Sequence, residues 1–500
     1  MQKVDTLPQG WIETTISELS ELVTKGTTPT TLGFEYINQK GVLFVKVESI
    51  KDQSIDHSKC AFINDETNEA LKRSQLKEED VLISIAGTLG RIGIVRSIDL
   101  PANTNQALAI IRPTKAILPK FLAYSLSSET TKGAVNSGKR GVGLQNLNLK
   151  QISGLRTVLP PLPEQKRIAH KIETLQSKTK KAKKALETAK PLLDKLRQSI
   201  LASAFRGDLT TDWRKNNPDV EPASVLLERI RIERRKKWEE NELAKMKAKG
   251  KEPKNDKWKS KYKEPEPVDT TDLAKLPNGW CWASIDEISC LVQYGSSSKT
   301  NENDKNIPVL RMGNIQNGQL VYENMRYLPI DHKDFPELFL LPGDILFNRT
   351  NSAELVGKTA VFEDIETPCS FASYLIRVRL INVIPCLISC YINSPLGRKW
   401  IQSCVSQQVG QANVNGTKLK ALVVPIPPIK EQIVLENKIR KLLHSLSNLN
   451  DQIKNIHDDI VLHDQAILSK AFAGNLVQQN FSDEPASVLI KRLKLISENR

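Results

Sequence analysis

The amino-acid sequence predicts an α+β protein built as an internal tandem repeat. Two globular domains are separated by two long antiparallel coiled-coil helices, with pseudo-two-fold symmetry. Three observations lead to this fold class. The chain opens with LPQGW at 7–11 and returns to LPNGW at 276–280. Each copy later contains the motif PP-x-x-EQ. Behind each motif, apolar residues alternate at spacings of four and three over about 40 residues, which is typical of a long paired helix.

The tandem repeat is supported by further matches that occur in the same order in both halves. Because the separation between matched segments stays nearly constant along the chain, the matches indicate a duplication. Identity is highest around PP-x-x-EQ and AFxGxL, whereas 12–140 and 281–410 keep a common pattern with little identity. The matched pairs include 79–95 with 343–361, 144–148 with 411–415, 198–209 with 465–476 and 221–230 with 484–493.

The two PP-x-x-EQ motifs each predict the start of a long helix. Proline suits a helix's first turn, and Glu164 and Glu431 would face the positive end of the helix dipole. Gly207 and Gly474 predict the helix ends, and Pro191 is expected to kink or interrupt the first helix. Each helix would be about 60 Å long and is the simplest partner for the other. The expected seam consists of Ile168, Ile172, Leu175, Thr179, Ala182, Leu186, Ala189, Leu193, Leu196 and Ile200, and of Leu435, Ile439, Leu442, Leu446, Leu449, Ile453, Ile456, Ile460, a packed His463 and Ile467.

The charge of the chain favours a polyanionic partner. Its 500 residues carry a formal net charge of +15, with a pI of about 9.3. An excess of positive charge favours nucleic acid over a membrane surface as the partner. The segment 228–267 is dense in Lys, Arg and Glu and contains Trp238, Trp258 and Tyr262. It is either a contact to DNA phosphates or a solvated helix and linker.

The seven cysteines predict reduced thiols in a cytoplasmic protein. They are scattered and form no CxxC pair. Cys386 and Cys390 are four residues apart, but no His/Cys set completes a zinc spacing, so we expect mostly buried, apolar roles. The N-terminus has no apolar segment of the secretory type, and no run approaches the length of a membrane helix.

No catalytic motif is found in the sequence. There is no GxxxxGK[ST] phosphate loop, and GTLGRIG at 87–93 is interpreted as a turn between strands. Pro218-Asp219 lacks the Glu-x-Lys that a nuclease would need on a following strand, and the six histidines form no pattern that would activate a nucleophile. The sequence therefore predicts a protein with no catalytic residues and no metal site.

Polar side chains near glycine turns are the candidate DNA contacts. Arginine pairs well with guanine, and Asn or Gln with adenine, while Lys and turn amides suit phosphates. The candidates in the first copy are Lys25, Thr27, Thr28, Arg91, Asn103, Asn105, Gln106, Lys139, Arg140, Gln145 and Asn146. Those in the second copy are Tyr294, Ser296, Ser298, Lys299, Arg311, Asn314, Arg349, Asn351, Gln408, Gln411 and Asn413.

These features together resemble the specificity (S) subunit of Type I restriction-modification systems. The resemblance rests on LPQGW and LPNGW, the turn TKGTTP, the segment GDILFNRTNSAELVGK, the two PP-x-x-EQ motifs, and AFRGDL with AFAGNL. It implies two α/β target-recognition domains, each reading one half of a bipartite site in double-stranded DNA. It also implies that the helices dock two methyltransferase (M) subunits, which modify adenine with S-adenosylmethionine. Restriction (R) subunits would then cut unmodified DNA with ATP and Mg, and the chain itself would need no cofactor and contact no membrane.

The resemblance and the repeat together divide the chain into six segments. These are a first target-recognition domain at 1–159, a helix at 160–206, a charged helix and linker at 207–275, a second target-recognition domain at 276–425, a helix at 426–473 and a C-terminal segment at 474–500.

Three alternatives to this function stay open at the level of sequence. The first is a coiled-coil interaction scaffold that does not bind DNA sequence-specifically. The second is a stand-alone enzyme such as a nuclease. The third is the specificity subunit of a methyltransferase that works without restriction.

The seam pattern makes a testable prediction. Leu186→Asp should weaken the pairing of the long helices, because a carboxylate without a partner is costly to bury, by about 3 kcal/mol or more at a fully buried site. Thermal unfolding and partner capture by the purified chain would measure the loss. Unchanged values for both would contradict the paired-helix arrangement.

Overall fold

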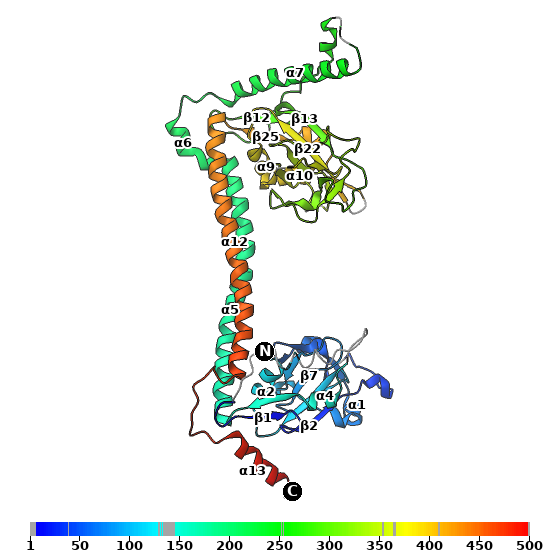
Figure 1. Ribbon diagram of the computed structural model, residues 1–500, viewed down its shortest axis with the longest axis vertical. Helices are drawn as coiled ribbons and strands as arrows, with labels where there is room; N and C mark the ends of the chain where they lie inside the picture. Colours follow the sequence, from blue (N-terminus) through cyan, green and yellow to red (C-terminus); the bar gives the residue numbers. More distant parts are fainter. Residues whose placement is uncertain are drawn as a thin grey trace. The chain divides into compact units, whose positions relative to one another are not determined.

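The computed structural model describes residues 7–498 apart from 39, 129–130, 132, 134–145, 252, 254, 353–354, 364–366 and 409–410. The chain divides into two compact units (Figure 1). Unit 1 contains residues 1–188 and 453–500, and unit 2 contains residues 189–452. Each long helix contributes one part to each unit, so these divisions differ from the six predicted segments.

Unit 1 contains the first globular domain. Its central sheet has the order β2-β10-β7-β8 and is antiparallel, and a smaller sheet has the order β6-β3-β9, with β3 and β9 parallel. The strands of the central sheet are β2 (Ser20–Lys25), β10 (Leu108–Pro113), β7 (Val81–Ser84) and β8 (Ile92–Ile94). The remaining elements are β1 (Ile12–Thr15) paired with β11 (Arg156–Leu159), β3 (Val42–Val45), β4 (Ile50–Lys51), β5 (Ser54–Ile55), β6 (Ala61–Ile63), β9 (Ala102–Thr104), α1 (Asp65–Ala70), α2 (Pro119–Leu126) and α4 (Leu149–Ser153).

Unit 2 contains the second globular domain, which repeats this topology. Its central sheet has the order β13-β22-β18-β20, and its smaller sheet has the order β17-β14-β21. These strands are β13 (Ser289–Tyr294), β22 (Leu375–Leu380), β18 (Ile345–Asn348), β20 (Thr359–Val361), β17 (Arg326–Leu328), β14 (Ile307–Leu310) and β21 (Ser370–Phe371). The other strands are β12 (Cys281–Ser284) paired with β25 (Val423–Ile426), the hairpin β15 (Ile315–Gln316) and β16 (Gln319–Leu320), and the sheet of β19 (Thr350–Asn351), β24 (Gln411–Asn413) and β23 (Ser406–Gln408). Its helices are α8 (Ile285–Ile288), α9 (Pro385–Asn393), α10 (Pro395–Cys404) and α11 (Gly416–Lys420).

One buried ion pair is repeated in both central sheets. Asp80 accepts two hydrogen bonds from Arg112, at 2.8 and 2.7 Å, and Asp344 accepts two from Arg379, both at 2.7 Å. Both carboxylates are buried. The hydrogen bonds that each arginine donates to its carboxylate raise the pKa of that arginine. The same bidentate ion pair joins the same two strands in each copy. The duplication is therefore visible in buried side-chain contacts as well as in the sequence.

The long helices pair antiparallel within each unit, as the sequence predicts. They are α5 (Leu162–Phe205) and α12 (Ile429–Phe472). In unit 1 the beginning of α5 packs against the end of α12, where Thr179 donates a 2.8 Å hydrogen bond to Asp464 and Lys183 forms a 2.9 Å ion pair with it. In unit 2 the roles are exchanged, because the end of α5 shares an apolar cluster with the beginning of α12.

The seam between the helices differs from the predicted one at every second position of α12. Leu446, Ile460 and Ile467 are buried, as expected. The alternate positions are not: Leu442, Leu449 and Ile456 are 38%, 46% and 48% exposed, and His463 is exposed as well. The neighbouring positions 443, 457 and 464 are partly buried instead. A straight α-helix drifts from a 3.5-residue repeat by about 20° per heptad. Apolar residues on one side of the predicted stripe therefore rotate away from the partner helix.

The ends and interior of α5 test two further expectations. Gly207 and Gly474 follow the long helices with φ of 82° and 76°, which confirms them as helix-ending glycines. The expected interruption at Pro191 is wrong, because α5 continues through this residue. Proline removes the hydrogen bond to the carbonyl four residues earlier. At Pro191 that carbonyl belongs to Glu187, which is exposed, and water can satisfy it.

Each globular domain also contacts the start of a helix that lies outside it in the sequence. In unit 2, Ala223 at the beginning of α7 (Ala223–Ala248) donates a 2.8 Å hydrogen bond to the carbonyl of Gly279. In unit 1, Ala486 at the beginning of α13 (Ala486–Glu498) makes the same bond, 3.0 Å long, to Gly10. The C-terminal segment therefore completes unit 1 in the way that residues 207–248 complete unit 2.

The PP-x-x-EQ motif joins each globular domain to its helix through a buried glutamine. The Gln165 amide accepts a 2.9 Å bond from the amide of Leu118 and donates 3.0 Å bonds to the carbonyls of Ala116 and Pro160. Gln432 repeats this with Ile384 and Pro427, at 3.0 and 2.9 Å. Both glutamines are 0% exposed. The hydrogen bonds fix the direction in which the helix leaves the domain.

The glutamate beside each glutamine has a different partner in each copy. Glu164 accepts a 3.0 Å hydrogen bond from the indole of Trp11. Glu431 instead accepts bonds from Thr210 and from the guanidinium of Arg214. Burial raises the pKa of Glu164, so its charged form is disfavoured in the folded chain. Such an acid contributes less to stability as the pH rises through its folded pKa.

Because their partners differ, the same substitution at the two glutamates should lower stability by different amounts. Glu431→Gln should lower the free energy of unfolding at pH 7 by about 1–3 kcal/mol, because the half-buried Arg214 loses its charged partner. Glu164→Gln is the matched control and should cost about 1 kcal/mol or less, with the smallest cost at neutral pH, where the wild type must keep its carboxylate charged. Urea unfolding of both variants from pH 4 to pH 7 measures this. Equal losses would contradict the assignment.

Candidate nucleic-acid interface

Exposed polar residues of the first domain gather at one edge of its central sheet. Lys25 ends β2 and pairs in register with Ala109 near the start of β10. Gln106 precedes β10 and is exposed. Its side-chain amide oxygen accepts a hydrogen bond from the hydroxyl of Thr28. The residues that the structure brings to this edge, here called the first sheet edge, are Lys25, Thr27, Thr28, Arg91, Asn105, Gln106 and Asn146.

Backbone hydrogen bonds bring two further loops to the first sheet edge. Ile85, directly after β7, donates a 2.8 Å bond to Ala107 and accepts a 2.9 Å bond from Leu147. Asn146 is exposed beside this contact. Arg91 is exposed where β8 begins, and its guanidinium donates a 3.2 Å bond to the carbonyl of Val47. The predicted contacts Lys139, Arg140 and Gln145 lie outside the described residues.

A glycine allows two loops to meet at this edge. A Cβ added to Gly26 would lie 1.8 Å from the carbonyl oxygen of Thr104. In the second domain, a Cβ on Gly295 would lie 2.2 Å from the carbonyl oxygen of Phe371. No side chain fits at such distances, so both turns require glycine. The two glycine turns predicted from sequence therefore occupy the same place in both copies.

The second domain presents a corresponding edge with different side chains. Tyr294 ends β13, and Arg349 follows β18. The guanidinium carbon of Arg349 lies 4.8 Å from the centre of the Tyr294 ring, and the Tyr294 hydroxyl accepts a 2.7 Å bond from the amide of Gly416. The Arg349 amide bonds to the carbonyl of Tyr374, and its carbonyl accepts from Val414. The predicted residues at this second sheet edge are Tyr294, Ser298, Lys299, Arg349 and Asn413.

Among the described residues, the guanidinium of Arg349 is only partly satisfied. One terminal nitrogen donates a 3.3 Å bond to the carbonyl of Ser373, while its buried Nε finds no acceptor there. The contact with the face of the Tyr294 ring restrains the planar fork of this arginine. That geometry suits a planar acceptor such as a base edge or a phosphate.

Three predicted contacts are buried, and we assign them to packing instead. Asn103 is 0% exposed and donates to Asn68 at 2.9 Å. Ser296 donates a 2.6 Å bond to Asp334. Asn314 donates a 2.8 Å bond to the carbonyl of Val321. Sequence could not distinguish these amides and hydroxyls from exposed ones, because no local pattern shows that Asn68, Asp334 and Val321 contact them.

Four other predicted contacts lie in a surface loop or in the small sheet β19-β24-β23. Arg311 is partly exposed and donates a 2.7 Å bond to the carbonyl of Asn324, which holds a surface loop. Asn351, Gln408 and Gln411 lie in the sheet β19-β24-β23, and their side chains lie outside the described part of the structure. An additional residue that the sequence reasoning missed is Tyr374, which is 50% exposed beside Arg349. An aromatic residue just before a buried strand was the available signal.

The described residues contain no group of three or more His, Cys, Asp or Glu side chains placed to hold a metal ion. None of the helices in the described part of the chain combines the length and hydropathy needed to cross a membrane. All seven cysteines are unpaired. Six of them are partly exposed and only Cys369 is buried, so the expectation of mostly buried cysteines is wrong.

Comparison with known proteins identifies the family. The model of the Type I restriction modification DNA specificity domain matches residues 8–188 and 277–460. The chain belongs to this family. Each matched region covers one globular domain together with the first part of its long helix. The chain is therefore a DNA specificity subunit of the type I restriction-modification class, with two specificity domains in tandem.

Some relatives match nearly the whole chain, and others match only a part of it. The EcoKI specificity subunit of Escherichia coli K12 is 24% identical over 503 residues, covering 98% of this chain and 96% of its own. The EcoBI specificity subunit of Escherichia coli is 37% identical over 199 residues, covering 39% and 42% of the two chains. The crystal structure of the HsdS subunit from Thermoanaerobacter tengcongensis has the same fold, with 18% identity, a TM-score of 0.56 and coverage of 94% and 98%.

The contrast between buried and exposed amides at the first sheet edge can be tested with two substitutions three residues apart. Asn103→Ala should lower the free energy of unfolding by about 1–3 kcal/mol, because it removes buried hydrogen bonds. Gln106→Ala should leave stability within about 0.5 kcal/mol and weaken specific DNA binding by about 1–3 kcal/mol. Urea unfolding and DNA titration measure the two effects. A reversed pattern would remove Gln106 from the interface.

Proposed function

We propose that each specificity domain reads one half of a bipartite DNA target through its sheet edge. The observation that carries the proposal is that corresponding strand ends in the two copies present different polar side chains on one scaffold. The first sheet edge carries Lys25, Thr28 and Gln106, and the second carries Tyr294 and Arg349. Amides favour adenine and arginine favours guanine, so the two edges would prefer different sequences.

The paired helices are the proposed docking surface for two methyltransferase subunits. Support comes from apolar side chains that the helices leave exposed within unit 2. Leu192 and Leu196 on α5 are 57% and 47% exposed, and Leu442 and Leu449 on α12 are 38% and 46% exposed. Apolar residues repeated along an exposed helical surface are typical of a surface that a partner covers. Restriction subunits would join the complex through the methyltransferase subunits.

In this proposal the chain itself is not an enzyme and takes no cofactor. Adenine methylation with S-adenosylmethionine, and cleavage with ATP and Mg, belong to the partner subunits. The chain supplies sequence selection by positioning DNA. We also propose a cytoplasmic location, which agrees with DNA as the ligand and with seven unpaired thiols.

A domain exchange combined with methylation mapping tests the proposal. Residues 12–140 are replaced by the corresponding part of a relative with a known target, and the chain is expressed with its methyltransferase partner. Modified adenines are then mapped by single-molecule sequencing. We expect a two-part motif with a fixed gap, in which the exchange changes only one half.

The other outcomes distinguish the alternatives. A change in both halves would contradict modular reading by two domains. A continuous motif would mean that only one domain reads DNA. A stable complex that modifies nothing would favour the interaction scaffold.

A further inference from the structure

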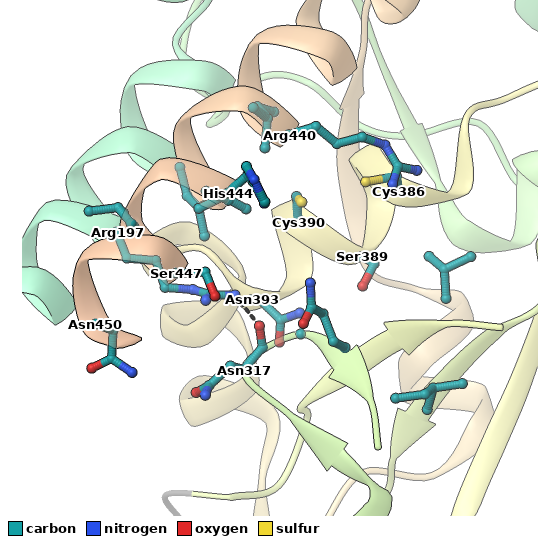
Figure 2. Close-up of a pocket in the computed structure, with 18 of the residues that line it drawn as sticks. Arg197, Asn317, Cys386, Ser389, Cys390, Asn393, Arg440, His444, Ser447 and Asn450 are labelled. Carbon is teal, nitrogen blue, oxygen red and sulfur yellow. Dashed lines mark hydrogen bonds between the residues drawn. The ribbon is translucent and has the colours of Figure 1, made fainter. Parts of the chain in front are cut away.

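Two cysteines lie on one face of α9 and line a cleft in unit 2. Cys386 and Cys390 are four residues apart, so their side chains point to the same side of the helix. Both are partly exposed. They line a cleft of about 1050 Å³ that is bounded by α5, α9, α12 and the hairpin of β15 and β16 (Figure 2). Both residues therefore border the cleft, and Cys386 is the less buried of the two thiols.

The two thiols influence each other's ionisation in opposite directions. The neighbouring Cys390 thiol lowers the pKa of the Cys386 thiol, although burial opposes this effect. The Cys386 thiol, together with burial, raises the pKa of Cys390 well above its usual value. Cys386 is therefore the member of the pair that ionises first. A thiolate is the nucleophilic form of cysteine, and a neighbouring thiol can resolve its oxidised product.

The position of Cys386 in the helix also favours a thiolate. It is the second residue of α9, directly after Pro385. Amides in a helix's first turn have no partner within the helix, and their dipoles stabilise negative charge. Figure 2 shows the Arg440 side chain extending from α12 toward Cys386. Glu436 raises the pKa of Cys386 more than Arg440 lowers it, and Glu363 raises it as well. Arg440 is itself ion-paired with Glu436 and Glu363, at 2.9 and 3.7 Å.

The first domain provides an internal comparison for this charge arrangement. Its helix α2 also begins with proline, and Lys120 occupies the place of Cys386. Lys120 forms an ion pair with Glu173 on α5. In the second copy, Arg440 stands where the first has Glu173. The long helix of unit 2 therefore carries a cation at the position where that of unit 1 carries an anion, and Cys386 replaces the lysine that forms the ion pair in unit 1.

The remaining cysteines lack these features. Burial raises the pKa of Cys281 to about 11 and that of Cys369 to about 12. Burial also raises the pKa of Cys60, Cys290 and Cys404. All seven cysteines lie in the described part of the chain, and Cys386 alone combines a thiol neighbour, a helix start and a facing arginine. The other five therefore serve as controls within the same molecule.

We propose that Cys386 and Cys390 form a peroxide-sensitive dithiol that closes reversibly to a disulfide. The Cys386 thiolate attacks one oxygen of hydrogen peroxide, the O–O bond breaks, and Cys386 becomes a sulfenic acid while hydroxide leaves. The Cys390 sulfur, having given its proton to hydroxide, then attacks the sulfenic sulfur. The S–O bond breaks and a second hydroxide leaves, which takes up the proton that Cys386 released to the solvent when it ionised. Overall, two thiols lose two electrons and two protons, and peroxide becomes two waters.

The geometry of α9 makes this disulfide easy to reduce. Side chains four apart on a helix have Cβ atoms about 5–6 Å apart, whereas a disulfide needs about 3.8 Å. The first turn of α9 must therefore tighten when the bond closes. Cys386 lies in that turn, where helical hydrogen bonds restrain the amides least. A strained and accessible disulfide is readily reopened by cellular thiols.

Mass spectrometry of the full-length chain tests the proposal. The reduced protein is treated with dilute hydrogen peroxide for increasing times, and free thiols are blocked with iodoacetamide. Trypsin releases residues 380–398, a peptide that contains both cysteines and no other. We expect this peptide to become two hydrogen atoms lighter and unalkylated, about tenfold faster than Cys404 or Cys290 loses reactivity. Dithiothreitol should restore both alkylation sites.

Two variants separate the roles of the cysteines. Cys390→Ser should leave Cys386 as a sulfenic acid that dimedone traps. Cys386→Ser should slow oxidation of Cys390 by about tenfold. The proposal is overturned if both cysteines of the wild-type peptide stay alkylatable while Cys404 is oxidised. It is also overturned if peroxide produces only disulfides between chains on a non-reducing gel. The readout does not depend on DNA binding or methylation.

Discussion

A fully buried glutamine at the start of each long helix is the contact on which the rest of each unit depends. The side chain of Gln165 makes three hydrogen bonds to the backbone of the neighbouring globular domain, and that of Gln432 makes two. The bonds go to the strand-to-helix turn before α2 or α9 and to the proline that precedes the long helix. Because a buried amide has no water to replace a lost partner, the helix and domain can join in only one orientation. The sheet edge of each domain is thereby fixed relative to the start of its own helix.

The two copies keep the framework and vary what they present. The glutamine contacts, the aspartate–arginine pair and the close glycine turn recur in both units. Around them, Trp11 approaches Glu164 in one copy, whereas Arg214 approaches Glu431 in the other. Buried contacts that involve several elements tolerate little change, while exposed strand ends can change freely. One scaffold can therefore carry two different sequence preferences.

The cleft beside α9 is a second place where the framework is kept while the side chains differ between the copies, and here the difference affects chemical reactivity. The positions of Lys120 and Glu173 in the first copy are occupied by Cys386 and Arg440 in the second. The sign of the charge on the long helix is reversed, and the ion pair of the first copy is replaced by a cysteine whose pKa is lowered mainly by the neighbouring Cys390 thiol. Oxidation chemistry in the second domain alone would therefore be compatible with an unchanged framework in both.

The sequence by itself determined the duplication, the long helices and the absence of a catalytic motif, because these depend on local periodicity and on matches along the chain. It also located the glycine turns and the helix-ending residues Gly207 and Gly474. Only the tertiary structure decided which flank of the α12 stripe pairs, and which amides reach the surface. Asn103 and Gln106 are the same kind of residue three positions apart, yet a neighbouring strand and helix cover the first and leave the second exposed. Burial is set by elements distant in sequence, and no local pattern records their positions.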